Sequence, residues 1–246
     1  MKELPQEFSG IYEVRNGVPV FKAYLAGEWV QASEVQDVRS PIDGSLLAKV
    51  PRLDFQAIDA ALQLMHDEGR FDIRDTPGEK RLEIYHKAAD LLLKFKDYFV
   101  DVLVLNNGKT YPAAEGEVKA AAERLRVADL DVRKIYGEYV PGDWSTETLE
   151  AEAVIKREPL GVVLAITPFN YPLFDVANKV VYSTVAGNAI MVKPASSTPI
   201  IALMFARVLE MAGFPRRALS IITLPGPQMG KAVSDPPVSV VSLTGT

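Results

Sequence analysis

The stretch Gly161-Val-Val-Leu-Ala-Ile-Thr-Pro-Phe-Asn-Tyr-Pro172 decides the fold of this chain. Residues 161–166 are apolar throughout, which is typical of a strand buried on both faces of a covered parallel sheet. The strand leads into a turn in which a single amide, Asn170, stands between Pro168 and Pro172. Because open α/β sheets bind ligands at the carboxyl ends of their strands, Asn170 is a candidate site residue.

Beyond this strand, the pattern alternates between strands and helices. We expect strands over residues 161–166, 189–193, 219–223 and 238–243, and helices over residues 173–185, 199–212 and 227–234. Strands and helices that alternate at this spacing indicate right-handed crossovers. The sequence therefore predicts an α/β fold with a Rossmann-like parallel sheet and flanking helices.

Before residue 160, three kinds of segment follow one another. Residues 1–52 indicate strands and turns, with a hairpin around Gly27. Helices are expected over residues 55–68, 77–95, 97–106 and 113–134. Asp54 and Thr76 are the expected N-caps of the first two of these helices. Residues 137–158 predict an antiparallel hairpin with exposed polar residues, an arm that reaches outside the main body.

The composition limits the classes of function. The chain has 246 residues, 48% of them hydrophobic, and a net charge of -5, so it can bury a core but has no basic surplus for nucleic acid. It contains no cysteine, which excludes disulfides, thiolate metal sites and a cysteine nucleophile within these residues, and no metal-ligand spacing occurs. Without a signal-peptide pattern or an apolar run near the ~18 residues of a membrane span, we expect a cytoplasmic protein with no membrane partner.

From the residues alone, Asn170 has two interpretations. Its amide caps the helix that follows, as in an Asx-type turn, or it donates to a reacting oxygen. A neutral amide suits the second task, because it stabilises a growing oxyanion without gaining or losing a proton. Both interpretations stay open at this point.

Motifs that occur in order along the chain resemble the aldehyde dehydrogenase superfamily. They are residues 157–172, Gly187-Asn-Ala, Val192-Lys-Pro194, Ala212-Gly-Phe-Pro215, Leu224-Pro-Gly226 and Leu243-Thr-Gly-Thr246, with Asn106-Asn-Gly-Lys109 and Glu117-Val118 before them. The Phe-Asn-Tyr form of the turn and the segment Val140-Pro-Gly-Asp-Trp144 are most similar to archaeal non-phosphorylating glyceraldehyde-3-phosphate dehydrogenases.

The resemblance implies roles for individual residues. Asn170 would be the side-chain donor of an oxyanion hole, and Lys179 would contribute local electrostatics and proton handling. The expected cofactor-binding residues are Ile166, Thr167, Pro168 and Phe169 at the nicotinamide end, Lys193 and Gly226 on the adenosine side, and Gly245 and Thr246 at the pyrophosphate.

Two residues are candidates for binding a substrate phosphate, namely Tyr171 and Arg124. Each candidate has an ordinary alternative: Lys179 and Arg124 are solvated charges, and Tyr171 is a buried ring whose hydroxyl is satisfied elsewhere.

Ser196 bears on the choice of cofactor. NAD-preferring members of the family commonly carry glutamate at this position, whereas serine can donate to a 2′-phosphate and Lys193 adds positive charge nearby. We therefore expect NADP as the cofactor, with NAD tolerated. The alternative is that residues 196–198 merely cap the helix that begins at Pro199.

The family's cysteine nucleophile and glutamate base follow the Thr-Gly-Thr element, so the resemblance implies an N-terminal half. We expect a partial cofactor-binding domain over residues 1–136 and 159–246 and an oligomerisation arm over residues 137–158, without the catalytic domain. The expected whole is a homo-oligomer that oxidises an aldehyde to an acid, above all glyceraldehyde 3-phosphate to 3-phosphoglycerate without phosphorylation. This chain alone would be inactive.

Two alternatives remain for the function. Succinate semialdehyde or lactaldehyde would replace the sugar phosphate as the substrate of a related aldehyde dehydrogenase. If the chain is complete as given, it would be a non-catalytic nucleotide-binding or pairing module.

Overall fold

Two sheets and a projecting hairpin organise the computed structural model, which describes residues 1–245, leaving aside the side chain of residue 227. The central sheet has six strands. In spatial order they are β12 (Val238–Leu243), β9 (Val162–Ile166), β10 (Ala189–Lys193), β11 (Leu219–Ile221), β3 (Ala23–Leu25) and β4 (Glu28–Val30).

The predicted parallel sheet is confirmed for β9 to β12, which pair in parallel. The sheet is nevertheless mixed, because β3 pairs antiparallel with β11 through Tyr24 and Ile221. The hairpin expected around Gly27 supplies the edge strands β3 and β4, and it turns at Ala26 and Gly27 with φ of 42° and 100°. Residues from the start of the chain thus complete a sheet built mainly by its last third.

A second sheet contains the other four strands that precede α1. It follows the 3₁₀ turn η1 (Gln6–Ile11) and contains β1 (Tyr12–Arg15), β2 (Val18–Phe21), β6 (Leu46–Pro51) and β5 (Val35–Arg39) in that spatial order.

Helices and short helical turns connect the strands. They are α1 (Phe55–Leu64), the π turn η2 (Met65–Gly69), α2 (Arg70–Arg74), α3 (Gly78–Lys94), α4 (Lys96–Asn107), α5 (Tyr111–Arg126), α6 (Asp129–Val132), η3 (Arg133–Ile135), α7 (Phe174–Val185), α8 (Pro199–Ala212), η4 (Arg216–Ala218), η5 (Gly226–Gln228) and α9 (Met229–Val233). No helix within residues 1–245 is long and apolar enough to cross a membrane.

One of the two predicted N-caps is confirmed. The Asp54 carboxylate accepts a hydrogen bond from the Ala57 N–H at 2.8 Å at the start of α1. The cap predicted at Thr76 is wrong, because α3 begins after Pro77. The Thr76 hydroxyl instead donates to the Asp72 carbonyl at 2.7 Å, which satisfies an open carbonyl of α2.

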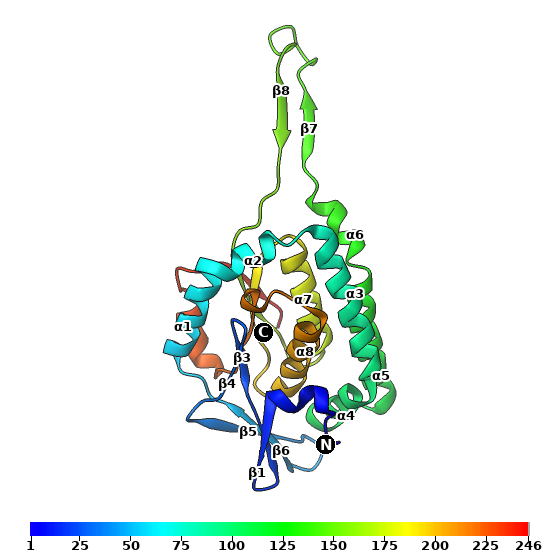
Figure 1. Ribbon diagram of the computed structural model, residues 1–246, viewed down its shortest axis with the longest axis vertical. Helices are drawn as coiled ribbons and strands as arrows, with labels where there is room; N and C mark the ends of the chain where they lie inside the picture. Colours follow the sequence, from blue (N-terminus) through cyan, green and yellow to red (C-terminus); the bar gives the residue numbers. More distant parts are fainter. Residues whose placement is uncertain (246) are drawn as a thin grey trace.

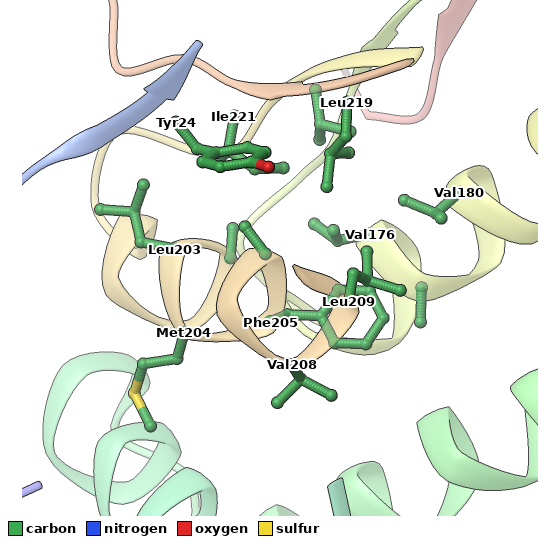
Figure 2. Packing of buried hydrophobic residues seen from close by; sticks show 14 of the residues in the cluster. Tyr24, Val176, Val180, Leu203, Met204, Phe205, Val208, Leu209, Leu219 and Ile221 are labelled. Carbon is green, nitrogen blue, oxygen red and sulfur yellow. The ribbon is translucent and has the colours of Figure 1, made fainter. Parts of the chain in front are cut away.

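The core is centred on α8, which is apolar on nearly every side. Figure 2 shows why: strands β3 and β11 lie over one side of α8, with Tyr24 and Ile221 above it. Its opposite side packs on α3 and α4. Phe205 in the middle of α8 is fully buried. A helix with protein on both sides needs no polar stripe.

The hairpin predicted over residues 137–158 is confirmed as β7 (Glu138–Pro141) paired antiparallel with β8 (Glu152–Ile155). All residues of both strands are exposed. Figure 1 shows the hairpin projecting away from the body, with α6 at its base.

Candidate functional site

The carboxyl ends of three central strands lie side by side. Ile166 at the end of β9 is the register neighbour of Lys193 on β10 and of Leu243 on β12. The Thr167 N–H donates to the Lys193 carbonyl at 3.2 Å, and the Thr244 N–H donates to the Ile166 carbonyl at 3.0 Å. The structure therefore gathers the predicted residues of this edge at the position where α/β sheets bind ligands.

Gly245 belongs to the same edge. A Cβ at Gly245 would lie 3.5 Å from the Cβ of Pro168, so the chain after β12 runs beside the Asn170 turn. Thr246 lies outside the described residues.

Two polar groups at this edge are buried with few partners. Lys193 is 7% exposed, and its ammonium contacts the Ser196 hydroxyl at 3.5 Å. Burial lowers the pKa of Lys193. The Thr167 hydroxyl is buried and has no hydrogen-bond partner among the described residues. Since buried polar groups are nearly always paired, both groups fit a polar ligand such as a dinucleotide.

The helix after the Asn170 turn is capped from outside. The N–H groups of Leu173 and Phe174 donate to one oxygen of Glu117, Oε1, at 2.8 and 3.1 Å. Asn170 makes neither of these bonds, and its side chain is exposed. The interpretation of Asn170 as a helix cap is therefore wrong, because Glu117 on α5 takes that role.

Further contacts reach the turn from residues 107–109. The Asn107 amide donates to the Phe169 carbonyl at 2.7 Å. The Lys109 ammonium lies 4.0 Å from the centre of the Tyr171 ring and pairs with Glu117 Oε2 at 2.7 Å. Tyr171 is 51% exposed, so the alternative of a buried ring is wrong.

Asn107, Lys109 and Glu117 lie in motifs quoted from the sequence, but no role at the site was predicted for them. A signal for Glu117 was present, because it stands on the buried stripe of α5 formed by Ala114, Val118 and Ala121. An acid on an apolar stripe needs a partner, since a buried carboxylate is costly when unpaired.

Lys179 on α7 reaches the neighbouring strand. Its ammonium donates to the Ser242 hydroxyl of β12 at 2.8 Å. Burial lowers the pKa of Lys179, and the nearby Asp175 carboxylate opposes that shift. Burial and then the charge of Glu117 raise the pKa of Asp175. Lys179 is half-buried, so the alternative of a solvated lysine is wrong.

The segment between β10 and α8 leaves Ser196 exposed. Thr198 is the N-cap residue of α8, but no side-chain cap bond forms there, and its hydroxyl is buried without a partner in the described part of the chain. The capping alternative for residues 196–198 is therefore wrong. At Gly226 an added Cβ would meet nothing within 4 Å, and its part in cofactor binding stays a prediction.

Arg124 is buried in a network apart from the turn. Its Nε donates to Asn178 Oδ1 at 2.7 Å, and its guanidinium pairs with Asp131. It also lies 4.3 Å from the centre of the Tyr182 ring. Arg124 is 8% exposed, so it is not a solvated charge. The network joins α5, α6 and α7 at the root of the hairpin, and substrate binding by Arg124 stays a prediction.

A metal centre was not expected at this site. Within the residues that the structure describes, no group of three His, Asp or Glu side chains is placed to hold a metal ion.

Comparison with known proteins gives matches over nearly the whole chain. A model of the Aldehyde dehydrogenase family matches residues 29–246. The 3-sulfolactaldehyde dehydrogenase of Priestia aryabhattai is 32% identical over 232 residues, which are 93% of this chain and 48% of that protein. The D-glyceraldehyde dehydrogenase (NADP(+)) of Picrophilus torridus is 30% identical over 92% of this chain and 45% of its own length.

A solved structure gives the same result. The NADP-dependent glyceraldehyde-3-phosphate dehydrogenase from Bacillus halodurans C-125, complexed with NADP, matches with a TM-score of 0.86 and 29% identity. The match covers 91% of this chain and 48% of that one. The chain spans about half the length of the curated relatives it matches.

Proposed function

Because the chain belongs to the aldehyde dehydrogenase family, we propose that it forms the cofactor-binding part of an enzyme that oxidises an aldehyde to a carboxylic acid. One observation carries the proposal. The end of β10 carries the buried ammonium of Lys193, and the end of the neighbouring β9 leads to the buried Thr167 hydroxyl, which has no partner among the described residues, and then to the exposed Asn170. Such donors suit a polar dinucleotide and a reacting oxygen beside it.

The cofactor would be a nicotinamide dinucleotide held by this edge, and when bound it supplies the hydride acceptor. Residues 166–169, with Gly226, Gly245 and Thr246, would line it, and Lys193 would donate to its adenosine half. Asn170 would donate to the substrate oxygen that gains negative charge. Lys179, half-buried on α7 near Asp175, would hold or release a proton beside that oxygen.

We further propose NADP as the preferred cofactor, with NAD tolerated. Ser196 Oγ and Lys193 Nζ lie 3.5 Å apart, so one ligand group would be within reach of both a hydroxyl and an ammonium. A 2′-phosphate accepts from both donors. The NADP named for the Picrophilus torridus relative and bound in the Bacillus halodurans structure is in line with this preference.

Calorimetric titration of the 246-residue chain with NADPH and NADH tests both proposals. NADPH should bind more tightly, and Ser196→Glu should weaken NADPH binding by about tenfold or more, since charge repulsion needs only ~1.4 kcal/mol for that factor. Ser197→Glu, next along the exposed segment, is the matched control. Equal affinity for both nucleotides would refute the NADP preference, and no binding of either would refute the cofactor role.

The proposed substrate is glyceraldehyde 3-phosphate, oxidised to 3-phosphoglycerate. The exposed Tyr171 would donate its hydroxyl to the substrate phosphate. Arg124 would have to exchange its partner Asp131 for the phosphate. A panel of glyceraldehyde 3-phosphate, succinate semialdehyde and lactaldehyde on the enzyme with its catalytic cysteine checks this order of preference.

We propose that the 246 residues alone do not oxidise aldehydes, because the family nucleophile is a cysteine and these residues contain none. Incubation with aldehyde and NADP should give no NADPH absorbance. Formation of NADPH would refute the proposal that these residues alone are inactive. The hairpin of residues 137–158 is the proposed oligomerisation arm, supported by exposed apolar side chains such as Trp144, which is 94% exposed. Sedimentation of the chain with and without this hairpin measures its part in assembly.

A further inference from the structure

We propose that Glu117 is a positioning residue: it holds the first turn of α7, fixes the turn that carries Asn170, and leaves the Asn170 amide free for a ligand. The role of Asn170 toward a substrate oxygen rests on the proposed function. The positioning itself is a property of the chain and is tested on the chain.

The open N–H groups at the start of α7 receive their acceptor from another helix. The first turn of every helix presents N–H groups that need acceptors, and asparagine just before a helix is among the preferred caps. In α7 the N-cap residue is Leu173, which has no acceptor in its side chain. Glu117 supplies the acceptor from α5, with bonds of 2.8 and 3.1 Å to Leu173 and Phe174. The amide of Asn170 is thereby released from capping.

The Glu117 carboxylate is held in a fixed position by partners at both of its oxygens. Its side chain is 0% exposed, and its second oxygen pairs at 2.7 Å with Lys109, which is 13% exposed. A buried carboxylate is stable only when its oxygens are paired, and here two N–H groups and an ammonium do so. The carboxylate is thus held on both sides and cannot turn away without leaving a buried charge unpaired.

Residues 107–109 connect the Glu117–Lys109 pair to the turn that carries Asn170. Lys109 packs on the ring of Tyr171, one residue after Asn170. Asn107 bonds the carbonyl of Phe169, one residue before Asn170. The backbone is therefore restrained on both sides of the amide, while the amide remains exposed. A donor fixed in advance stabilises a developing charge without reorganisation during the reaction.

The experiment compares three variants of the 246-residue chain by NMR. Glu117→Ala removes the acceptor, Glu117→Gln keeps an oxygen but loses the charge, and Glu115→Ala is the control on the same helix. Glu115 pairs with Lys96 and Lys119 and is 27% exposed. The readouts are hydrogen exchange of the Leu173 and Phe174 amides, the side-chain NH₂ signals of Asn170, and the urea midpoint.

In Glu117→Ala, exchange at Leu173 and Phe174 should speed up by about tenfold or more, as expected for losing a hydrogen bond to a charged acceptor. The Asn170 NH₂ signals should shift or broaden. Glu117→Gln should lie between this variant and the wild type, and Glu115→Ala should match the wild type. If Glu117→Ala does not fold, the comparison of Glu117→Gln with Glu115→Ala decides.

A purely structural role for Glu117 would lower the urea midpoint and leave the Asn170 signals unchanged, and that result would overturn the proposal. Unchanged exchange at Leu173 and Phe174 in Glu117→Gln would also overturn it. The nucleotide titrations described above are independent of these readouts. A wild-type chain that binds no nucleotide would defeat the proposed function and leave the positioning by Glu117 standing.

Discussion

Replacing Arg124 with methionine tests whether this residue stabilises the fold through its buried ion pair. Its guanidinium pairs with Asp131, and the two side chains are 9% and 7% exposed. The substitution keeps the length of the apolar stem but leaves the Asp131 carboxylate buried with Lys134, at 3.4 Å, as its remaining ion pair among the described residues. Asn178 also loses the donor to its Oδ1.

The expected loss in the free energy of unfolding is about 3–5 kcal/mol, the usual result of removing one partner from a buried ion pair. That is a large share of the roughly 5–15 kcal/mol that stabilises a domain. Replacing both partners, as in Arg124→Met/Asp131→Leu, should recover most of the loss, because no unpaired buried charge remains.

Urea unfolding followed by circular dichroism measures these differences. Arg126→Met is the matched control, because Arg126 lies two positions along the same helix and pairs with Asp90 at the surface, at 46% and 73% exposure. An exposed pair of this kind contributes about 0–1 kcal/mol. If Arg124→Met costs no more than Arg126→Met, the buried network does not hold the root of the hairpin, and the reasoning fails.

Two further substitutions test the strand edge and the core. Lys193→Met should stabilise the nucleotide-free chain at neutral pH and weaken NADPH binding, because burial lowers the Lys193 pKa and folding disfavours the ammonium. The free energy of unfolding of the wild type should therefore rise as the pH increases from that lowered pKa to the ordinary 10.5. Urea titrations at several pH values measure this, and the same pH dependence of stability in the wild type and in Lys193→Met would contradict it. Phe205→Ala should cost about 3–5 kcal/mol by the same urea titration, since the ring is fully buried on α8, and an unchanged midpoint would refute that packing.

Local pattern was enough to predict most elements of the last third of the chain, although β11 ends at Ile221 and the helix expected over residues 227–234 is the 3₁₀ turn η5 followed by α9. The helix expected over residues 199–212 has the same bounds as α8. Pro199 at its first position and Gly213 after its end mark the two termini. The strands expected over residues 189–193 and 238–243 are β10 and β12. In each case the residues that predict the element lie within it or directly beside it.

Contacts between distant segments could not be predicted in this way. The pairing of β3 with β11 depends on Tyr24 meeting Ile221, and neither segment carries a sign of the other. The cap of α7 depends on Glu117, which comes from a different helix. The sequence therefore offered Asn170 as a cap, although Asn170 does not fill that role. The error at Thr76 has a local cause instead, because α3 begins one residue later than expected, after Pro77.

The edge hairpin β3–β4 has a consequence for the order of events during synthesis. The Ala26 N–H bonds the Ser220 hydroxyl, 194 residues further along the chain. At a translation rate of about 5–20 residues per second, the hairpin waits roughly 10–40 s for its partner strand to be made. During that wait the apolar side chains of β3 have no sheet to cover them. The nascent chain is then most exposed to chaperones and to aggregation, and slow codons between these segments would lengthen the wait.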